Sequence, residues 1–235
     1  MTVHTFHLAE VPAVVGARAL LRPPTPDAVP GLDHAECLAT MRLGAPVVSP
    51  DRLQLRRLAV FAQWRDEAAV DRFLYSDGLG RALAGGWHVR LEYLRRWSTI
   101  ATFPCLPVRA GRWEPDEPVV AVTLARMRAA QVPRFLRWGR PVERQVRDHP
   151  ATTLAFAAYR PPHTISTFSV WRSAAEMEEM VHGHSTGPEP MRHRDAMAER
   201  ARHDFHHEFA TYRFRALSEH GSWAGRTGIL PSPPA

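Results

Sequence analysis

The sequence of 235 residues contains no lysine, so all 30 residues counted as lysine or arginine are arginine. This absence excludes chemistry that needs a lysine amine, such as a Schiff base with pyridoxal phosphate or with a carbonyl substrate. It also excludes the GxxxxGK[ST] loop, whose lysine contacts the phosphates of a bound nucleotide. Any reaction of this chain must therefore follow another route.

Cysteine and long apolar runs are also scarce. Cys37 and Cys105 are the only cysteines, so there is neither a disulfide framework nor the spacing of a zinc site, and Cys105 has no obvious base nearby. No apolar run approaches the roughly 18–20 residues that span a bilayer, and the first residues lack the basic region of a signal peptide. We therefore expect a cytoplasmic protein with no membrane span.

The positive charge is not gathered in one block. The formal net charge is +6, but the arginines are spread along the chain and mixed with Asp and Glu. Proteins that bind nucleic acid usually concentrate their cations in a patch or stripe. We expect no nucleic-acid partner.

Two segments of the chain resemble each other. FAQWRDEA (61–68) matches FSVWRSAA (168–175) at an offset of 107, and in each a strand leaves through Trp-Arg into a helix capped by Asp or Ser. RLEYLRRW around Tyr93 resembles FATYRFRAL around Tyr212, at an offset of 119. The longer second offset fits the His-, Gly- and Pro-rich insert 182–190. These echoes predict an internal repeat.

Periodicity predicts the same order of elements, β-α-β-β-α-β, in both halves. The first half has expected strands at 3–9, 34–44, 53–64 and 88–94, and expected helices at 13–21 and from Asp66. The second half has expected strands at 119–125, 152–160, 163–171 and 208–217, and expected helices at 128–147 and after Trp171.

This order predicts an α+β protein, a tandem ferredoxin-like (βαββαβ)2 repeat forming a dimeric α+β barrel within one chain. The expected divisions are a first half at 1–107, a linker at 108–118, a second half at 119–223 and a tail at 224–235. Two such units hide their apolar sheet faces against each other, which predicts a cavity between two sheets. The alternative is two independent domains.

Histidine is over-used, with 13 residues, and six of them cluster between 182 and 207. An exposed histidine usually has no special role. His182 and His184 flank Gly183 in the insert, but two histidines without a carboxylate are a weak metal signal. His193 lies in an amphipathic helix, where a histidine above an apolar cavity has the geometry of a haem ligand.

The second half also resembles a known family. The segments TFSVWRSAAEM and HRDAMAERARHDFHHEFATYRFRALSEHGSWAGR are similar to the spheroidene monooxygenase-like family of dimeric α+β barrel proteins. The likeness covers residues 152–226 well, and the first half only through FAQWRDEAAVDRF. It implies one haem in the cavity, with His193 as the axial ligand, and oxygenation of an apolar substrate. The insert before His193 is longer than the family pattern, so His182 and His184 stay open as ligands.

A haem site also needs apolar walls and cations for the propionates. Each aromatic residue is nevertheless more often core than cofactor wall. The candidate cofactor-binding residues are His193, Arg192, Arg172, Arg213, Trp171, Phe168, Phe156 and Phe209.

The resulting hypothesis is a haem-dependent, monooxygenase-like oxidoreductase that acts on a small apolar metabolite in secondary metabolism, with a homo-oligomer as one option for its assembly. The alternatives are a non-enzymatic binding barrel, a cofactor-free monooxygenase of the antibiotic-biosynthesis type, and a haem-dependent dehydratase or rearrangement enzyme. Neither the substrate nor the oligomeric state follows from the residues.

Overall fold

The computed structural model describes residues 2–43, 54–103, 106–186 and 189–232. The first half comprises β1 (Val3–Glu10), α1 (Ala13–Leu21), β2 (Leu32–Met41), β3 (Gln54–Trp64), α2 (Glu67–Ser76), α3 (Gly78–Ala84) and β4 (Trp87–Trp97). The second comprises β5 (Val119–Met127), the 3-10 turn η1 (Ala129–Gln131), α4 (Val132–Asp148), β6 (Thr152–Arg160), β7 (Thr164–Trp171), α5 (Ala174–His182), α6 (Arg192–Arg202) and β8 (His206–His220).

The expected helix after Asp66 is in fact two helices. Asp66 caps α2 by accepting a hydrogen bond from the Ala69 amide, and Asp77 caps α3 by accepting from the amides of Leu79 and Gly80. Gly80 is required there, because a Cβ at this position would lie 1.9 Å from the carbonyl oxygen of Phe73.

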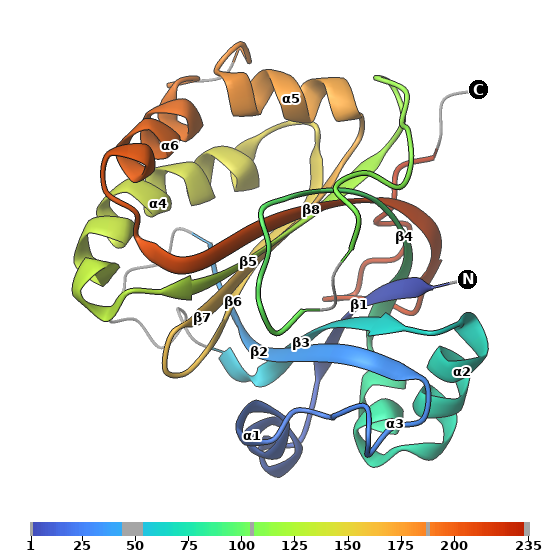
Figure 1. Cartoon of the computed structure of the whole chain (residues 1–235). Helices are drawn as coiled ribbons and strands as arrows, with labels where there is room; N and C mark the ends of the chain where they lie inside the picture. The colour runs from blue at the N-terminus through green and yellow to red at the C-terminus, as the bar shows by residue number, and fades with distance from the viewer. Residues whose placement is uncertain (1, 44–53, 104–105, 187–188, 233–235) are drawn as a thin grey trace.

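The eight strands close into one antiparallel barrel in the order β1-β3-β2-β6-β7-β5-β8-β4 (Figure 1). Each half supplies four adjacent strands, β4-β1-β3-β2 and β8-β5-β7-β6. The two seams between the halves differ in length over the described residues. β4 pairs with β8 from His88 to Trp97, whereas the described pairing of β2 with β6 runs from Ala39 to Met41. The α+β class is confirmed, and the expected pair of facing sheets is a continuous barrel.

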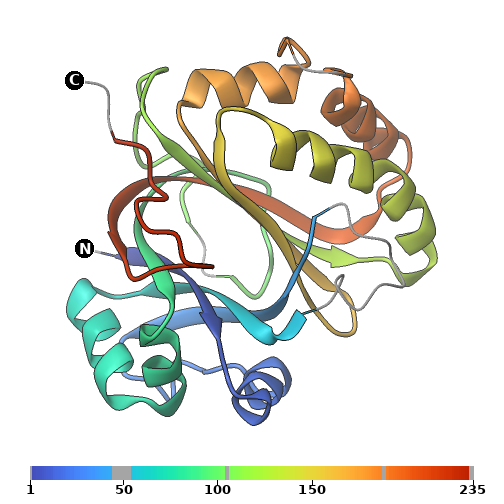
Figure 2. The same ribbon diagram turned by 180° about the vertical axis from the view of Figure 1, so that it is seen from behind.

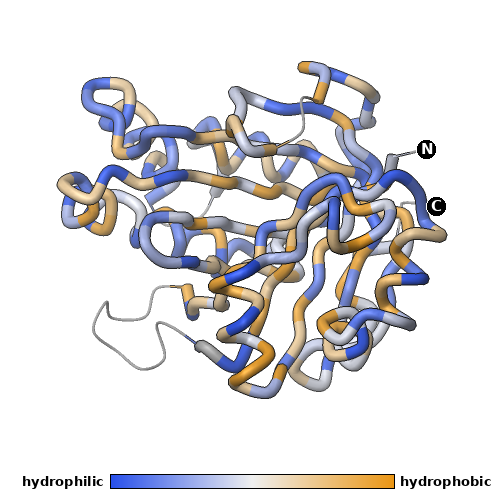
Figure 3. Tube along the Cα trace, turned by 60° about the horizontal axis from the view of Figure 1, so that its bottom comes forward, coloured by the Kyte–Doolittle hydropathy of each residue, from blue (hydrophilic) through white to orange (hydrophobic). Residues whose placement is uncertain are grey.

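Helices cover the outside of this barrel in two groups. Helices α1, α2 and α3 lie against the strands of the first half, and α4, α5 and α6 lie on the side of the second half (Figures 1 and 2). Hydrophobic and polar stretches both occur along the chain trace (Figure 3), and residues 58–62 of β3 are all hydrophobic. Successive side chains of a strand point to opposite faces, so one set lies in the interior and the other beneath the helices.

Aromatic side chains fill the barrel interior. Phe6, Phe61, Phe168 and Phe214 are at most 1 % exposed, and the ring centroids of Phe6 and Phe168 are 4.1 Å apart. An eight-stranded barrel is just wide enough for side chains to fill it. The cavity expected between two sheets is therefore occupied by the core itself, which corrects that expectation.

Both ends of the barrel are closed by irregular segments. At one end, the chain after β4 inserts Ile100 and Phe103 into the interior cluster, and Phe103 stacks on Phe61 at 5.3 Å. At the other end, Ile229 and Leu230 of the tail pack on the same cluster, and their amides donate to the Glu219 carboxylate. The interior is thus sealed from both sides by the described residues.

Within the described part of the chain, no helix is long and apolar enough to cross a membrane.

Several histidines are buried in the neutral form, which predicts a loss of stability in mild acid. Burial lowers the pKa of His4 to about 4, although its hydrogen bond with Gln63 opposes the shift. The unfolded chain binds this proton near pH 6.5 and the folded chain does not. The free energy of unfolding therefore falls as the pH drops from about 6.5 towards 4, by roughly 2 kcal/mol for His4 between pH 7 and pH 5.

Urea unfolding of His4→Gln at pH 7 and at pH 5 tests this expectation. The variant should lose less stability between the two pH values than the wild type does. His163→Gln is the control, because His163 is exposed. An equal loss in all three proteins would show that His4 does not stay neutral in the fold.

Candidate functional site

The outer face of the first half is completely covered. Cys37, Val60 and Ala62 on this face are at most 2 % exposed, and even the polar Thr5 and His7 are fully buried. These residues and the helices above them form one continuous apolar cluster. This face offers no surface to a ligand.

The outer face of the second half carries two separate apolar clusters. In one, Phe135 and Trp138 of α4 pack near Ile165. In the other, Met177 and Met180 of α5 pack near Trp171. Ile165 and Trp171 lie on the same face of β7, six residues apart, so the strand between them is not covered by either cluster.

Small and hydroxyl-bearing residues occupy this interval. Register pairing sets Thr211, Thr123 and Thr167 side by side across β8, β5 and β7, and Ala121 beside Ser169 in the next row. Thr167 is exposed although β7 is an inner strand, while Thr123, Thr211 and Ser169 are half-buried. We call Thr123, Thr167, Ser169 and Thr211 the hydroxyl band. It is an accessible polar strip on a face that helices should bury.

His193 lies in the helical layer over this same half. Its Nδ1 is 3.1 Å from the carbonyl oxygen of Val181, near the end of α5. Because a carbonyl oxygen only accepts, Nδ1 carries the ring hydrogen and Nε2 keeps its lone pair. Burial lowers the pKa of His193, and this outweighs the carbonyl hydrogen bond, so the imidazole is neutral. A histidine fixed in this tautomer is prepared to bind a metal through Nε2.

Gln145 fixes the start of α6, and sequence reasoning missed it. Its Oε1 accepts a hydrogen bond from the His193 amide, and its Nε2 donates to the carbonyl oxygen of Pro190. His193 therefore stands where α4, α5 and α6 meet.

The other proposed ligands are less constrained. His182 and His184 are exposed, with ring centroids 6.3 Å apart. Within the described ranges, no group of three or more His, Cys, Asp or Glu side chains is arranged to hold a metal ion. Cys105 lies outside the described residues.

The structure does not bring the proposed aromatic walls together. Phe156 and Phe168 lie on the barrel interior, with ring centroids 5.4 Å apart. Trp171 lies on the outer face beneath α5, and Phe209 lies on the outer face under the guanidinium of Arg200. Only the outward pair shares a face with the helical layer that holds His193.

The proposed arginines are divided as well. Arg213 is buried beside the hydroxyl band, where it pairs with Glu178 at 2.7 Å and stacks on Trp97 and Trp113. Arg192 forms an ion pair with Glu189. Arg172 is exposed at the end of β7 and has no contact with His193 among the described interactions.

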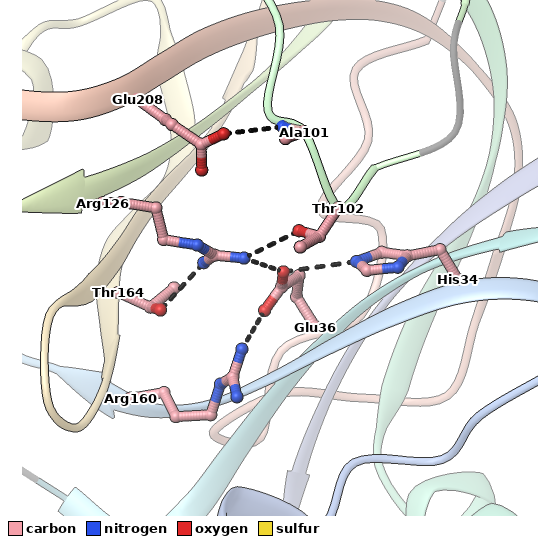
Figure 4. Close-up of polar contacts among 8 residues, drawn as sticks. All are labelled: His34, Glu36, Ala101, Thr102, Arg126, Arg160, Thr164 and Glu208. Atoms are coloured by element: carbon pink, nitrogen blue, oxygen red, sulfur yellow. Dashed lines mark hydrogen bonds and ion pairs between the residues drawn. The ribbon is translucent and has the colours of Figure 1, made fainter.

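A second polar constellation lies inside one barrel end (Figure 4). The Glu36 carboxylate, 1 % exposed, accepts hydrogen bonds from Arg126 at 2.5 Å and from Arg160 at 2.6 Å. Arg126 also donates to Thr164 and Thr102, and the nearby Ala101 amide donates to Glu208. These hydrogen bonds connect the segment after β4 to strands β2, β5, β6 and β7.

This cluster is built for structure rather than for proton transfer. Burial alone would raise the pKa of Glu36, but the hydrogen bond from His34 and the charges of Arg126 and Arg160 lower it to about 2. A carboxylate with so low a pKa does not exchange protons near neutrality. The outer face of the second half is therefore the better candidate site.

Comparisons with known proteins identify the fold. No protein-family model matches the chain, and no curated protein matches it. Among solved structures, an aldoxime dehydratase in complex with butyraldoxime superposes with a TM-score of 0.52 at 8 % identity, over 92 % of this chain and 79 % of that chain. At such low identity the likeness establishes a shared fold and nothing finer.

Two further structures from Listeria monocytogenes are more distant. A ferredoxin-fold protein related to antibiotic biosynthesis monooxygenases, from strain 4b F2365, has a TM-score of 0.30 at 9 % identity, over 92 % of this chain and 97 % of that chain. A heme-degrading enzyme has a TM-score of 0.29 at 10 % identity, over 88 % and 98 %. The resemblance to the spheroidene monooxygenase-like family stays a prediction.

The ion cluster generates a stability prediction. Glu36→Gln leaves Arg126 and Arg160 without their buried counter-charge, and breaking a buried ion pair in this way costs about 3–5 kcal/mol. The free energy of unfolding from urea titrations should fall by that amount. Glu10→Gln is the control, since Glu10 pairs with Arg57 on the surface and should cost less than about 1 kcal/mol. Equal losses in the two variants would contradict a central role for Glu36.

Proposed function

We propose that this protein is a haem-binding oxidoreductase whose cofactor is held between the hydroxyl band and helices α4–α6, with His193 as the axial ligand. The observation that carries the proposal is the neutral imidazole of His193, whose Nδ1 is tied to the Val181 carbonyl oxygen. The exposure of Thr167 supports it, because a well-packed α/β layer would bury that side chain.

The residues around the site have the chemical types that a haem site needs. Small side chains on the sheet, such as Ala121, Thr123 and Ser169, leave depth for a flat group. Arg213 lies on β8 beside the hydroxyl band and Arg192 is the first residue of α6, and each can offer a propionate its guanidinium in exchange for its present carboxylate partner. Phe156 and Phe168 are core residues in this proposal and take no part in binding.

A bound haem supplies an iron centre that can activate oxygen or peroxide. The chain supplies the rest. The Val181 carbonyl oxygen holds the imidazole of His193 in one tautomer, and Gln145 holds the first turn of α6 against α4. The hydroxyls of Thr167, Thr211 and Ser169 can donate hydrogen bonds to a polar atom of the substrate. With few acid–base groups on this face, oxidation of an apolar metabolite fits better than hydrolysis.

We also infer that the two halves descend from one duplicated ferredoxin-like unit, divided as the sequence predicts into 1–107, 108–118, 119–223 and 224–235. The matching strand orders β4-β1-β3-β2 and β8-β5-β7-β6 support this inference. The first copy then serves as scaffold and the second carries the site.

Titration of the full chain with hemin tests the cofactor and its ligand. We expect a Soret band at one haem per chain, and a shifted band with at least tenfold weaker hemin affinity in His193→Ala. His184→Ala and His182→Ala are matched controls and should bind hemin as the wild type does. Thr167→Phe should also weaken uptake by filling the band, whereas Thr99→Phe, on an exposed loop, should not.

The absence of a Soret band in the wild type would overturn haem binding. A band that changes in His184→Ala but not in His193→Ala would overturn the ligand assignment while leaving the cofactor. Circular dichroism of each variant shows whether a loss of binding merely reflects a loss of fold.

The reaction is tested with the haem-loaded protein and hydrophobic substrates. With a reductant and oxygen, or with peroxide, mass spectrometry should detect products that have gained oxygen. Aldoximes belong in the same panel, because the structure with the TM-score of 0.52 is an aldoxime dehydratase. Conversion of an aldoxime to a nitrile and water would favour the dehydratase alternative. No product from any substrate would favour a non-enzymatic binding barrel.

A further inference from the structure

A surface cavity of about 440 Å³ lies at the barrel end closed by the tail. It is lined by the first residues of β6, the end of α4, the start of the β7–α5 connection, and Arg226 and residues 228–231 of the tail. Among the described residues, β2 pairs with residues 157–159 of β6, so these first residues of β6 lie beyond that pairing. His193 and its partners Val181 and Gln145 do not line the cavity.

Three arginines from three different elements converge on this cavity. Arg147 comes from α4, Arg172 follows β7, and Arg226 comes from the tail. Arg147 forms a bidentate ion pair with Asp148, in which Nε and Nη2 donate to the two carboxylate oxygens at 2.6 and 2.7 Å. No described carboxylate pairs with Arg172 or Arg226, and no acidic residue lines the cavity. Among the described residues, two of the three arginines at the cavity therefore have no acidic partner.

One of these arginines is held in place by the cavity wall itself. The Arg226 guanidinium donates a hydrogen bond to the Thr153 carbonyl oxygen at 3.1 Å. Beside it, Leu154, Ile229 and Leu230 provide an apolar floor.

We propose that this cavity is a second binding site, for a small organic anion. Its carboxylate or phosphate group is held by the guanidinium groups of Arg172 and Arg226. Its apolar part rests on Leu154 and Leu230. Guanidinium groups suit both anions because their paired N–H groups match two oxygens at once. The volume lies in the range of small-molecule sites.

Calorimetric titration of the full chain with octanoate, acetate and inorganic phosphate tests this site. Octanoate should bind saturably and at least tenfold more tightly than acetate, because its chain covers the apolar floor. Added salt should weaken the binding. Arg172→Ala/Arg226→Ala should lower the octanoate affinity at least tenfold. Phosphate bound more tightly than acetate at the same arginines would identify a phosphate-bearing ligand.

The matched control is Arg22→Ala/Arg81→Ala, which removes the same charge from exposed positions in the first half. It should bind octanoate as the wild type does. No saturable binding of any probe, or equal binding by the two double variants, would overturn the proposal. Competition with hemin shows whether octanoate binds at the proposed haem site or at a separate site. If hemin displaces octanoate and Arg172→Ala/Arg226→Ala abolishes the Soret band, the cavity is part of the haem site and not a second site.

Discussion

Closure of the eight-stranded barrel is the constraint on which the rest of this structure depends. Once β4 meets β8 and β2 meets β6, the interior has room only for side chains, and Phe6, Phe61, Phe168 and Phe214 fill it. Burying one such aromatic ring contributes about 3–5 kcal/mol, judged by what its truncation costs. An interior built this way cannot also hold a cofactor, so binding must occur on the outer surface or at the barrel ends.

The two halves then divide the remaining tasks through their outward-facing residues. In the first half, Cys37, Val60 and Leu58 give the helices a continuous apolar face. In the second, Thr167 and Ser169 stand where the offset of 107 places Val60 and Ala62 in the first, and the apolar clusters lie on either side of them. The same strand order thus yields a sealed scaffold in one half and an accessible strip in the other.

The sequence predicted most elements because their signals are local: strand alternation, Asp and Ser caps, and helical spacing. It did not predict which residues meet. Phe156 and Phe168 are even-numbered and face inward, whereas Trp171 and Phe209 are odd-numbered and face outward. Counting along β7 and β8 could have separated them. Glu36, Arg126 and Arg160 come from three distant strands, so only the closed barrel reveals their contact.

Buried neutral histidines occur throughout this fold, so neutrality alone does not single out His193. His4 donates from Nε2 to Gln63, which leaves its Nδ1 buried without a partner. His206 resembles His193 more closely, since its Nδ1 pairs with Asp204, but Phe135, Phe205 and Phe209 surround its ring. His193 combines a fixed Nδ1 hydrogen with a place in the helical layer over an uncovered strip of sheet. That combination, rather than the abundance of histidine, is the reason for proposing His193 as the ligand.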